Sequence, residues 1–152
     1  RDPLWSRGLG DVYKRQADYI HLDVMDGQFV PNKTFDHTKI KELRPLTLIP
    51  FDAHLMINEP VKHVRDYKDA GSDIITVHAE VCDESSFGEI CDMLDSNQVG
   101  IGLAINPDTD PSNLLKYFDY LDYILIMSVF PGFGGQSFIE ETLESLLLKT
   151  EH

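Results

Sequence analysis

The sequence predicts an α/β fold with a parallel sheet, built as part of a TIM (β/α)8 barrel. Short runs rich in Val, Ile and Leu alternate with amphipathic stretches, and a new run begins roughly every 25 residues, as successive βα units do. Polar side chains gather at the carboxyl ends of several runs, where TIM barrels carry their active sites. Strands are expected to begin near residues 18, 48, 73, 99 and 122.

A complete barrel has eight units and about 250 residues, so the five units visible after residue 16 correspond to about five-eighths of a barrel. The other architecture with this alternation is a doubly wound nucleotide-binding sheet. That fold places a G-x-G-x-x-G fingerprint after its first strand, and residues 24–36 contain no such glycine pattern. The barrel is therefore the favoured architecture.

Helix signals separate the expected strands. Asn58 and Asp110 are expected to be N-caps, each followed by a proline in the first turn, and Gly71 suits the exit from the first of these helices. Apolar residues at helical spacing predict which side chains face the sheet. The expected stripes are Val61, Val64 and Tyr67 or Lys68; Phe87, Ile90, Cys91 and Leu94; Leu114, Leu115 and Phe118; and Leu143, Leu146 and Leu147.

Length and composition limit the function classes. The 152 residues suit one domain with a real core, and a hydrophobic content of 42% is typical of a globular protein. A net charge of −13 argues against nucleic acid and anionic membranes as partners, because both require clustered Lys and Arg. No apolar run approaches the ~20 residues of a membrane span. The two cysteines lack a C-x-x-C spacing, so a cytoplasmic protein with buried thiols is expected.

Residues 1–16 differ from the rest of the chain. They contain four of the thirteen basic residues and show neither helical nor strand periodicity. The segment GLGDVYKRQ resembles translated adapter sequence that contaminates proteins predicted from metagenome assemblies. We interpret residues 1–16 as a non-native leader, with a genuine disordered tail as the alternative. The partial barrel domain is expected to span residues 17–152.

Two pairs of polar residues interrupt the first two strands. Side chains alternate along a strand, so His21 and Asp23 face the same way, and Asp52 and His54 repeat this spacing on the next strand. If the two strands are adjacent and in register, all four side chains meet at one mouth of the barrel. Imidazole and carboxylate groups are ligands for a divalent transition metal such as zinc, iron, manganese or cobalt. A single histidine of this kind is more often hydrogen-bonded in a core, but two aligned pairs favour a metal site.

A glycine-rich segment, SVFPGFGGQSF, follows the fifth strand. Glycines let the backbone approach an anion closely, and the N-terminus of a following helix offers free N–H groups, with Ser137 as its expected cap. A phosphate is the natural ligand, and an ordinary βα turn is the alternative. The expected substrate-binding residues of this loop are Gly132, Phe133, Gly134 and Gly135.

Further residues at strand ends complete the expected pocket. Met25, Met56 and Met127 are interpreted as following the polar residues of their strands, at equivalent strand ends, and are expected to form a pocket wall, although methionines often only fill gaps in cores. Other candidates, with supporting roles, are His78, Glu80, Asn106 and Ser128.

Five segments, in this order and spacing, resemble the ribulose-phosphate 3-epimerase family. They are HLDVMDGQFVPN, FDAHLMI, IITVHAE, GLAINP and MSVFPGFGGQSF, and the resemblance covers residues 17–149. It implies a TIM barrel that interconverts ribulose 5-phosphate and xylulose 5-phosphate, through an enediolate, in the pentose phosphate and Calvin pathways. It also implies one divalent metal ion and, for the full-length protein, a homo-oligomer.

The resemblance assigns roles to individual residues. His21, Asp23 and His54 fall on the family's metal ligands, and Asp23 also falls on its general base. His54 additionally falls on a substrate contact, and Gly132 to Gly135 on a substrate-binding loop. Asp26 is expected instead to shape the turn that follows the first strand.

Parts of the family pattern are absent. The family's first strand, with a substrate-contacting serine, has no counterpart here. Neither have its seventh and eighth strands, which carry the acid of the opposite face, a fourth metal ligand and most of the phosphate grip. We therefore expect the chain as printed to be inactive and poorly folded alone. Gln28 replaces a histidine often found after the glycine, which leaves the substrate preference open.

Three rival functions share parts of this pattern. A sibling epimerase for a ketohexose phosphate such as allulose 6-phosphate would have the same metal site and a pocket of different size. An inactive fragment would retain only metal or phosphate binding. The decarboxylase and hexulose-phosphate synthase branch of phosphate-binding barrels requires D-x-K-x-x-D. His21-x-Asp23-x-x-Asp26 lacks the lysine, so this branch is excluded.

Overall fold

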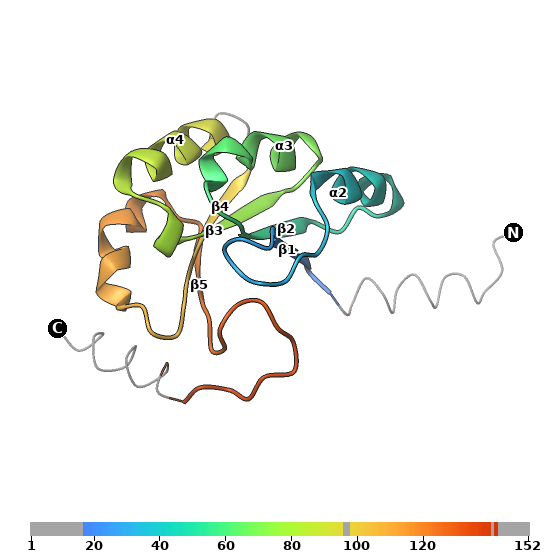
Figure 1. Cartoon of the computed structure of the whole chain (residues 1–152). Coiled ribbons are helices and arrows are strands. Elements are labelled where there is room, and N and C mark those ends of the chain that lie inside the picture. Colours follow the sequence, from blue (N-terminus) through green and yellow to red (C-terminus); the bar gives the residue numbers. More distant parts are fainter. Residues whose placement is uncertain (1–16, 96–97, 141, 143–152) are drawn as a thin grey trace, which may run out of the picture.

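A computed structural model describes residues 17–95, 98–140 and 142 (Figure 1). Its five strands form one sheet in the order β1-β2-β3-β4-β5, and each strand pairs in parallel with the next strand along the chain. This sequential parallel order confirms the predicted α/β class and agrees with part of a TIM barrel. The strands are β1 (Ile20–Met25), β2 (Phe51–Met56), β3 (Ile74–His78), β4 (Gly100–Ile105) and β5 (Tyr123–Ile126).

Helical segments connect the strands, and Figure 1 shows α2, α3 and α4 following one another along one side of the sheet. The α-helices are α2 (His37–Leu43), α3 (Val64–Asp69) and α4 (Glu84–Asp95). The 3-10 helices are η1 (Arg44–Leu46), η2 (Pro60–Lys62), η3 (Ala79–Val81) and η4 (Pro111–Tyr120). In the part of the chain that the structure describes, no helix combines the length and apolar character that crossing a membrane requires.

The two faces of the sheet have different chemistry because side chains alternate along each strand. The face under the helices is apolar and forms the main core. The opposite, inner face carries polar side chains on its first three strands. Core residues of the sheet include Leu22, Val24, Ala53, Leu55, Ile75, Val77, Ile101 and Leu103, packed in one cluster with Ile40, Val64, Phe87, Ile90 and Leu94 from the helices.

The helical segment after β2 begins later than predicted. Asn58 does not cap a helix. Glu59 adopts a left-handed conformation with φ of 50°, which interrupts a helix at this point. A short 3-10 turn follows, and α3 then starts with His63 as its N-cap. The predicted exit is confirmed, because Gly71 has φ of 100°, a value that favours glycine.

The segment after β4 is capped as predicted but differs in its buried face. The Asp110 side chain accepts a hydrogen bond from the Ser112 N–H, at 2.8 Å. Because η4 is a 3-10 helix, residues three apart lie on one face, and Leu114 is buried together with Tyr117. The α-helical spacing used for the prediction was wrong here. Leu115 and Phe118 are 63% and 49% exposed.

The remaining predicted stripes have different outcomes. The stripe of α4 is confirmed, since its four members are buried. They are Phe87, Ile90, Cys91 and Leu94. The stripe formed by Leu143, Leu146 and Leu147 lies outside the described residues, as does the segment 1–16.

Candidate metal centre

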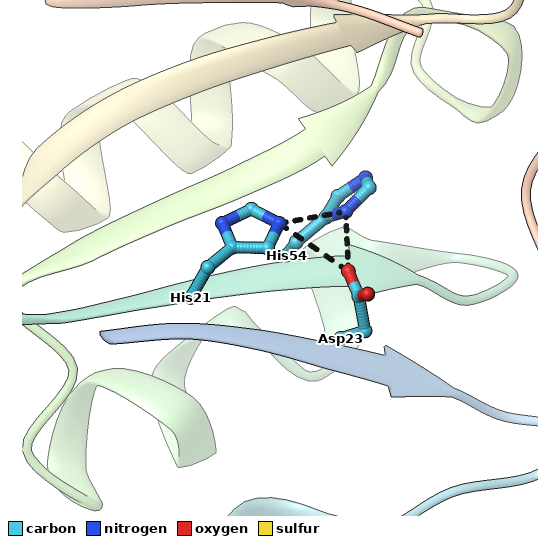
Figure 2. A group of neighbouring side chains, drawn as sticks. All are labelled: His21, Asp23 and His54. Carbon is cyan, nitrogen blue, oxygen red and sulfur yellow. Dashed lines mark hydrogen bonds and ion pairs between the residues drawn. The ribbon is translucent and has the colours of Figure 1, made fainter. Parts of the chain in front are cut away.

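The register between β1 and β2 brings the two predicted polar pairs together. His21 lies opposite Asp52, and Asp23 lies opposite His54. Figure 2 shows His21, Asp23 and His54 pointing toward one another from these two strands. The Asp23 Oδ1 atom is 3.3 Å from His21 Nε2 and 3.0 Å from His54 Nδ1, and the two nitrogen atoms are 3.3 Å apart. The adjacency and register assumed from the sequence are therefore present.

These three side chains fit a divalent cation. Two imidazole nitrogens and one carboxylate oxygen form a ligand set typical of transition metals. Ligand atoms that lie about 2.0–2.2 Å from a tetrahedral cation are about 3.3–3.6 Å from one another, close to the separations seen here. The side chain of His54 is 1% exposed, whereas those of His21 and Asp23 are 42% and 53% exposed. One face of the cluster is therefore open to a further ligand or a substrate.

Asp52 does not join this cluster as a ligand but orients His21. Its Oδ2 atom lies 2.6 Å from His21 Nδ1, which directs Nε2 toward Asp23 and His54. Its other oxygen, Oδ1, accepts a hydrogen bond from Thr76 Oγ1 at 2.9 Å. A carboxylate behind a ligating imidazole is the usual arrangement at protein metal sites. The four predicted residues thus divide into three possible ligands and one supporting acid.

Thr76 and Tyr123 extend this support, and the sequence reasoning missed both. The Tyr123 hydroxyl is hydrogen-bonded to Thr76, whose hydroxyl in turn reaches Asp52. Space for the tyrosine ring exists because Gly102 has no side chain. A Cβ atom there would lie 2.5 Å from Thr76 Oγ1 and 2.7 Å from the tyrosine Cζ. Thr76 could have been identified from the sequence, because it lies two residues before His78 and therefore on the same face of β3.

Hydrogen bonds and burial shift the pKa values of this cluster. Hydrogen bonding to Asp23 and then to Asp52 raises the pKa of His21 from 6.5 to about 9. The hydrogen bond from His21, followed by the interaction with His54, holds the pKa of Asp23 far below its usual value. Burial would raise the pKa of Asp52, but hydrogen bonds from His21, Tyr123 and Thr76 outweigh it and lower that pKa. Burial lowers the pKa of His54. At neutral pH the cluster therefore consists of ionised carboxylates, a protonated His21 and a neutral His54.

Residues predicted to have supporting roles lie behind His54. His54 Nε2 is 2.8 Å from His78 Nε2, and His78 Nδ1 is 3.1 Å from Glu80 Oε2. The Asn106 N–H donates to Glu80 Oε1 at 2.8 Å. Ser128 takes no part in this arrangement, and its carbonyl oxygen accepts a hydrogen bond from the Ile139 N–H.

The three methionines occupy strand ends of the inner face. Met25 and Met56 are opposite one another across β1 and β2. Met127 follows β5 directly, and its N–H donates to the Ile105 carbonyl at 3.0 Å. Met56 is buried, while Met25 and Met127 are partly exposed. Their role as a pocket wall stays a prediction.

Asp26 shapes the loop after β1, as expected. Its Oδ1 atom accepts hydrogen bonds from the N–H groups of Gln28 and Phe29, at 2.7 and 2.9 Å. Its Oδ2 atom accepts from the Asn58 N–H at 2.8 Å, which ties the loop to the end of β2. Asp26 therefore fixes two loops and does not belong to the metal cluster.

The glycine-rich loop packs against the loop after β1, and the two segments approach one another in Figure 1. The Asn32 side chain donates a hydrogen bond to the Gly132 carbonyl. Gly132 has φ of 113°, and a Cβ atom there would lie 3.1 Å from Val30 Cβ. The Gln136 amide nitrogen donates to the carbonyl oxygens of Phe130 and Phe133, at 2.6 and 2.8 Å. The loop is therefore folded onto the metal-cluster end of the sheet.

Part of this loop remains accessible. Among the described residues, no atom beyond the chain neighbours lies within 4 Å of a Cβ built at Gly134 or Gly135, so both backbones are open to a ligand. The predicted helix cap is wrong for the described residues, because residues 136–139 are not helical and Ser137 therefore caps no helix there. Phosphate binding by residues 132–135 stays a prediction.

Sequence comparison identifies known proteins to which this chain is similar. The profile of the Ribulose-phosphate 3 epimerase family matches residues 5–150. The ribulose-phosphate 3-epimerase of Bacillus subtilis (strain 168) is 43% identical over 138 residues, which are 91% of this chain and 63% of that protein. The chloroplastic ribulose-5-phosphate-3-epimerase of Arabidopsis thaliana is 44% identical over 130 residues, 86% of this chain and 46% of that protein. The ribulose-phosphate 3-epimerase of Synechocystis sp. is 47% identical over 132 residues, 86% of this chain and 56% of that protein.

The chain thus spans between about half and two thirds of the length of these relatives. The profile match extends over nearly the whole chain and includes every strand of the sheet. Together with the sequential parallel sheet, this match shows that the chain belongs to the ribulose-phosphate 3-epimerase family.

Proposed function

We propose that the protein is a metal-dependent isomerase that inverts C3 of a ketopentose phosphate, interconverting D-ribulose 5-phosphate and D-xylulose 5-phosphate. The observation that carries this proposal is the convergence of His21, Asp23 and His54 at an accessible end of the sheet. The family membership supports the substrate class. The substrate is a small phosphorylated ketose, and the net charge of −13 gives no support to a nucleic-acid partner.

Asp23 is the proposed base. Its ionised carboxylate takes the proton from C3, the C3–H bonding electrons form the C2–C3 double bond, and the C2 carbonyl oxygen receives the negative charge of the enediolate. The neighbouring imidazoles of His21 and His54 keep Asp23 ionised, but they also lower its pKa and weaken it as a base. Its task therefore depends on stabilisation of the enediolate oxygen.

A divalent cation bound to His21, Asp23 and His54 would supply that stabilisation as a Lewis acid. His21 and His54 would each supply one ligand nitrogen to it, and they also fix the direction of the Asp23 carboxylate. A second acid on the opposite face of the sugar is expected to return the proton to C3. Inversion requires this acid because the proton must arrive from the other side.

Asp23→Asn in the protein expressed from its complete coding sequence tests the assignment. The change removes the base and a charged ligand together. We therefore expect turnover to fall by about 10²–10⁴-fold or more, and the metal content of the protein to be reduced. Asp66→Asn is the matched control, because Asp66 is an exposed carboxylate of α3, and it should leave turnover unchanged. Turnover of Asp23→Asn equal to that of the control would overturn the proposal. Measuring both a ketopentose and a ketohexose phosphate as substrates separates the proposed activity from the sibling activity.

The short chain itself is proposed to be inactive. In the described sheet β1 and β5 each pair with one neighbour only, so both edges are open. Closure is the means by which a barrel removes such edges. The described cluster also offers three possible ligands, whereas a catalytic site of this kind is expected to use a further protein group as the acid.

A further inference from the structure

A second line of hydrogen-bonded groups lies behind His54, on the side away from Asp23. His54 Nε2 is 2.8 Å from His78 Nε2, and His78 Nδ1 is 3.1 Å from Glu80 Oε2. The side chains of both histidines are buried, at 1% and 0% exposure. The Phe29 ring covers His78, with ring centroids 4.8 Å apart. Each contact in this line must therefore be satisfied by the residues themselves, because an unpaired buried polar group is costly.

Glu80 determines which nitrogen of each histidine carries the proton. Its Oε1 atom already accepts hydrogen bonds from the Asn106 N–H and the Thr109 hydroxyl, which fixes the carboxylate in place. An ionised carboxylate only accepts hydrogen bonds, so the proton between Oε2 and His78 must reside on His78 Nδ1. A neutral His78 then has a lone pair on Nε2.

That lone pair determines the tautomer of His54. His54 must carry its proton on Nε2 in order to donate to His78, and this leaves the lone pair on His54 Nδ1. His54 Nδ1 is the atom that faces His21 Nε2 and Asp23 Oδ1. In the opposite order, His54 Nδ1 would donate to Asp23 Oδ1, 3.0 Å away, but no proton would lie between His78 Nδ1 and Glu80. The missing proton is costlier at the Glu80 end, because His78 is fully buried, whereas the Asp23 carboxylate is 53% exposed and also faces His21. Two N–H groups would also face one another across the 3.3 Å between His21 Nε2 and His54 Nδ1.

We infer that Glu80 and His78 are positioning residues that hold His54 in the tautomer required of a metal ligand. This inference rests on the proposed metal centre and adds a residue that does not touch the cation. Partners behind a ligand typically change metal affinity by about 10–100-fold when they are altered. The described contacts make Glu80 the origin of this effect for His54, as Asp52 is for His21.

Glu80→Gln and Glu80→Ala distinguish a positioning role from a structural role. Glutamine has the shape of glutamate and keeps one oxygen for Asn106 and Thr109, but it presents an NH2 group to His78 Nδ1. This donor reverses the line, because His78 must then accept at Nδ1 and donate from Nε2, which leaves the proton of His54 on Nδ1. Alanine removes the anchor of the Asn106 segment without imposing either direction.

We therefore expect Glu80→Gln to bind Zn²⁺ about 10–100-fold more weakly than the wild type, and Glu80→Ala to be affected less. Zn²⁺ dissociation constants are measured by competition with a chelator, in the protein expressed from its complete coding sequence. Glu84→Gln is the matched control, since Glu84 pairs with Lys116 on the exposed side of α4 and should not change affinity. A structural role predicts the reverse order, with alanine the more damaging change, and that order would overturn the inference.

The ¹⁵N chemical shifts of the histidine rings test the same line without metal or turnover. In the wild type we expect the proton of His54 on Nε2 and the proton of His78 on Nδ1. In Glu80→Gln each proton should lie on the other nitrogen of the same ring. Protonated Nδ1 on His54 of the wild type would overturn the inference even if a variant fails to fold. Loss of turnover in Asp23→Asn does not depend on this pattern, so failure of the inference and failure of the proposed function remain distinguishable.

Discussion

His21 and Asp52 lie opposite one another in the β1–β2 register, and their side chains are also in contact, with 2.6 Å between His21 Nδ1 and Asp52 Oδ2. This side-chain contact determines which nitrogen of His21 faces the cluster. Because Nδ1 is occupied by the carboxylate, Nε2 is the atom available beside Asp23 and His54. A residue that is not a ligand therefore controls one of the three ligand atoms.

Asp52→Asn should weaken this control. We expect a lower pKa for His21, shifted from about 9 toward 6.5, because one of its two carboxylate partners is lost. Zn²⁺ affinity should fall by about 10–100-fold, as is common when the group behind a ligating histidine is changed. NMR titration of His21 and chelator competition measure the two effects. Asp69→Asn, at an exposed residue of α3, is the control. An unchanged His21 pKa in Asp52→Asn would contradict the assigned role.

Metal binding should depend on pH through His21. Its pKa is raised to about 9, so below this pH a cation must displace a proton from Nε2. We expect the apparent Zn²⁺ affinity to rise about tenfold per pH unit between pH 7 and 9 and then to level off.

The raised pKa of His21 makes the stability of the metal-free protein fall with rising pH, whereas it makes the metal affinity rise. A raised pKa stabilises the folded state fully below pH 6.5, and this contribution is lost as the pH rises through about 9. Chelator competition and thermal unfolding with a chelator present, each over this pH range, check the two signs. An apparent affinity that is constant between pH 7 and 9 would exclude protonated His21 as the competitor.

Gly102→Ala should destabilise the protein through the supporting network. The new Cβ would lie 2.5 Å from Thr76 Oγ1 and 2.7 Å from Tyr123 Cζ, so one of these side chains must move. We expect a loss of about 1–3 kcal/mol in the free energy of unfolding, as for other overpacked core sites. Gly88→Ala is the matched control, because Gly88 lies in α4 and, among the described residues, nothing beyond its chain neighbours and the backbone of its own helix lies within 4 Å of the added Cβ. That change should instead stabilise by about 0.5–1 kcal/mol. Urea unfolding measures both, and equal effects would contradict the packing argument.

The metal cluster and the strand positions could largely be predicted from the sequence, because both depend on local periodicity. The two-residue spacing placed His21 with Asp23 and Asp52 with His54, and the parallel register of β1 and β2 then completed the cluster. Strand positions were predicted well for the same reason, with expected starts near 48 and 122 against the observed Phe51 and Tyr123.

The remaining features depend on contacts between distant segments or on backbone detail. Tyr123 reaches Thr76 across Gly102, and nothing in the local pattern of β5 specifies that contact. The buried face of η4 was predicted wrongly because an α-helix and a 3-10 helix select different neighbours of Leu114. The role of Asp52 also required the structure, since its spacing alone does not distinguish a ligand from the acid behind one.

Gly134→Val tests the proposed phosphate loop. In the described part of the chain, no atom beyond the chain neighbours lies within 4 Å of a Cβ at Gly134, so the valine side chain has room and occupies space that a ligand would need. Gly132 is unsuitable for this test, because its φ of 113° would strain any other residue. We expect Gly134→Val to raise KM for the phosphorylated sugar at least about tenfold, with a smaller effect on kcat, because backbone N–H groups bind an anion only at close approach.

Inorganic phosphate separates a binding defect from a folding defect. It should inhibit the wild type competitively and inhibit Gly134→Val more weakly, while thermal unfolding of the two proteins stays similar. Gly134→Ala is the matched control, because one methyl group leaves most of the open space free, and its KM should change little. If valine changes neither KM nor inhibition by phosphate, the loop is an ordinary turn and the phosphate is bound elsewhere.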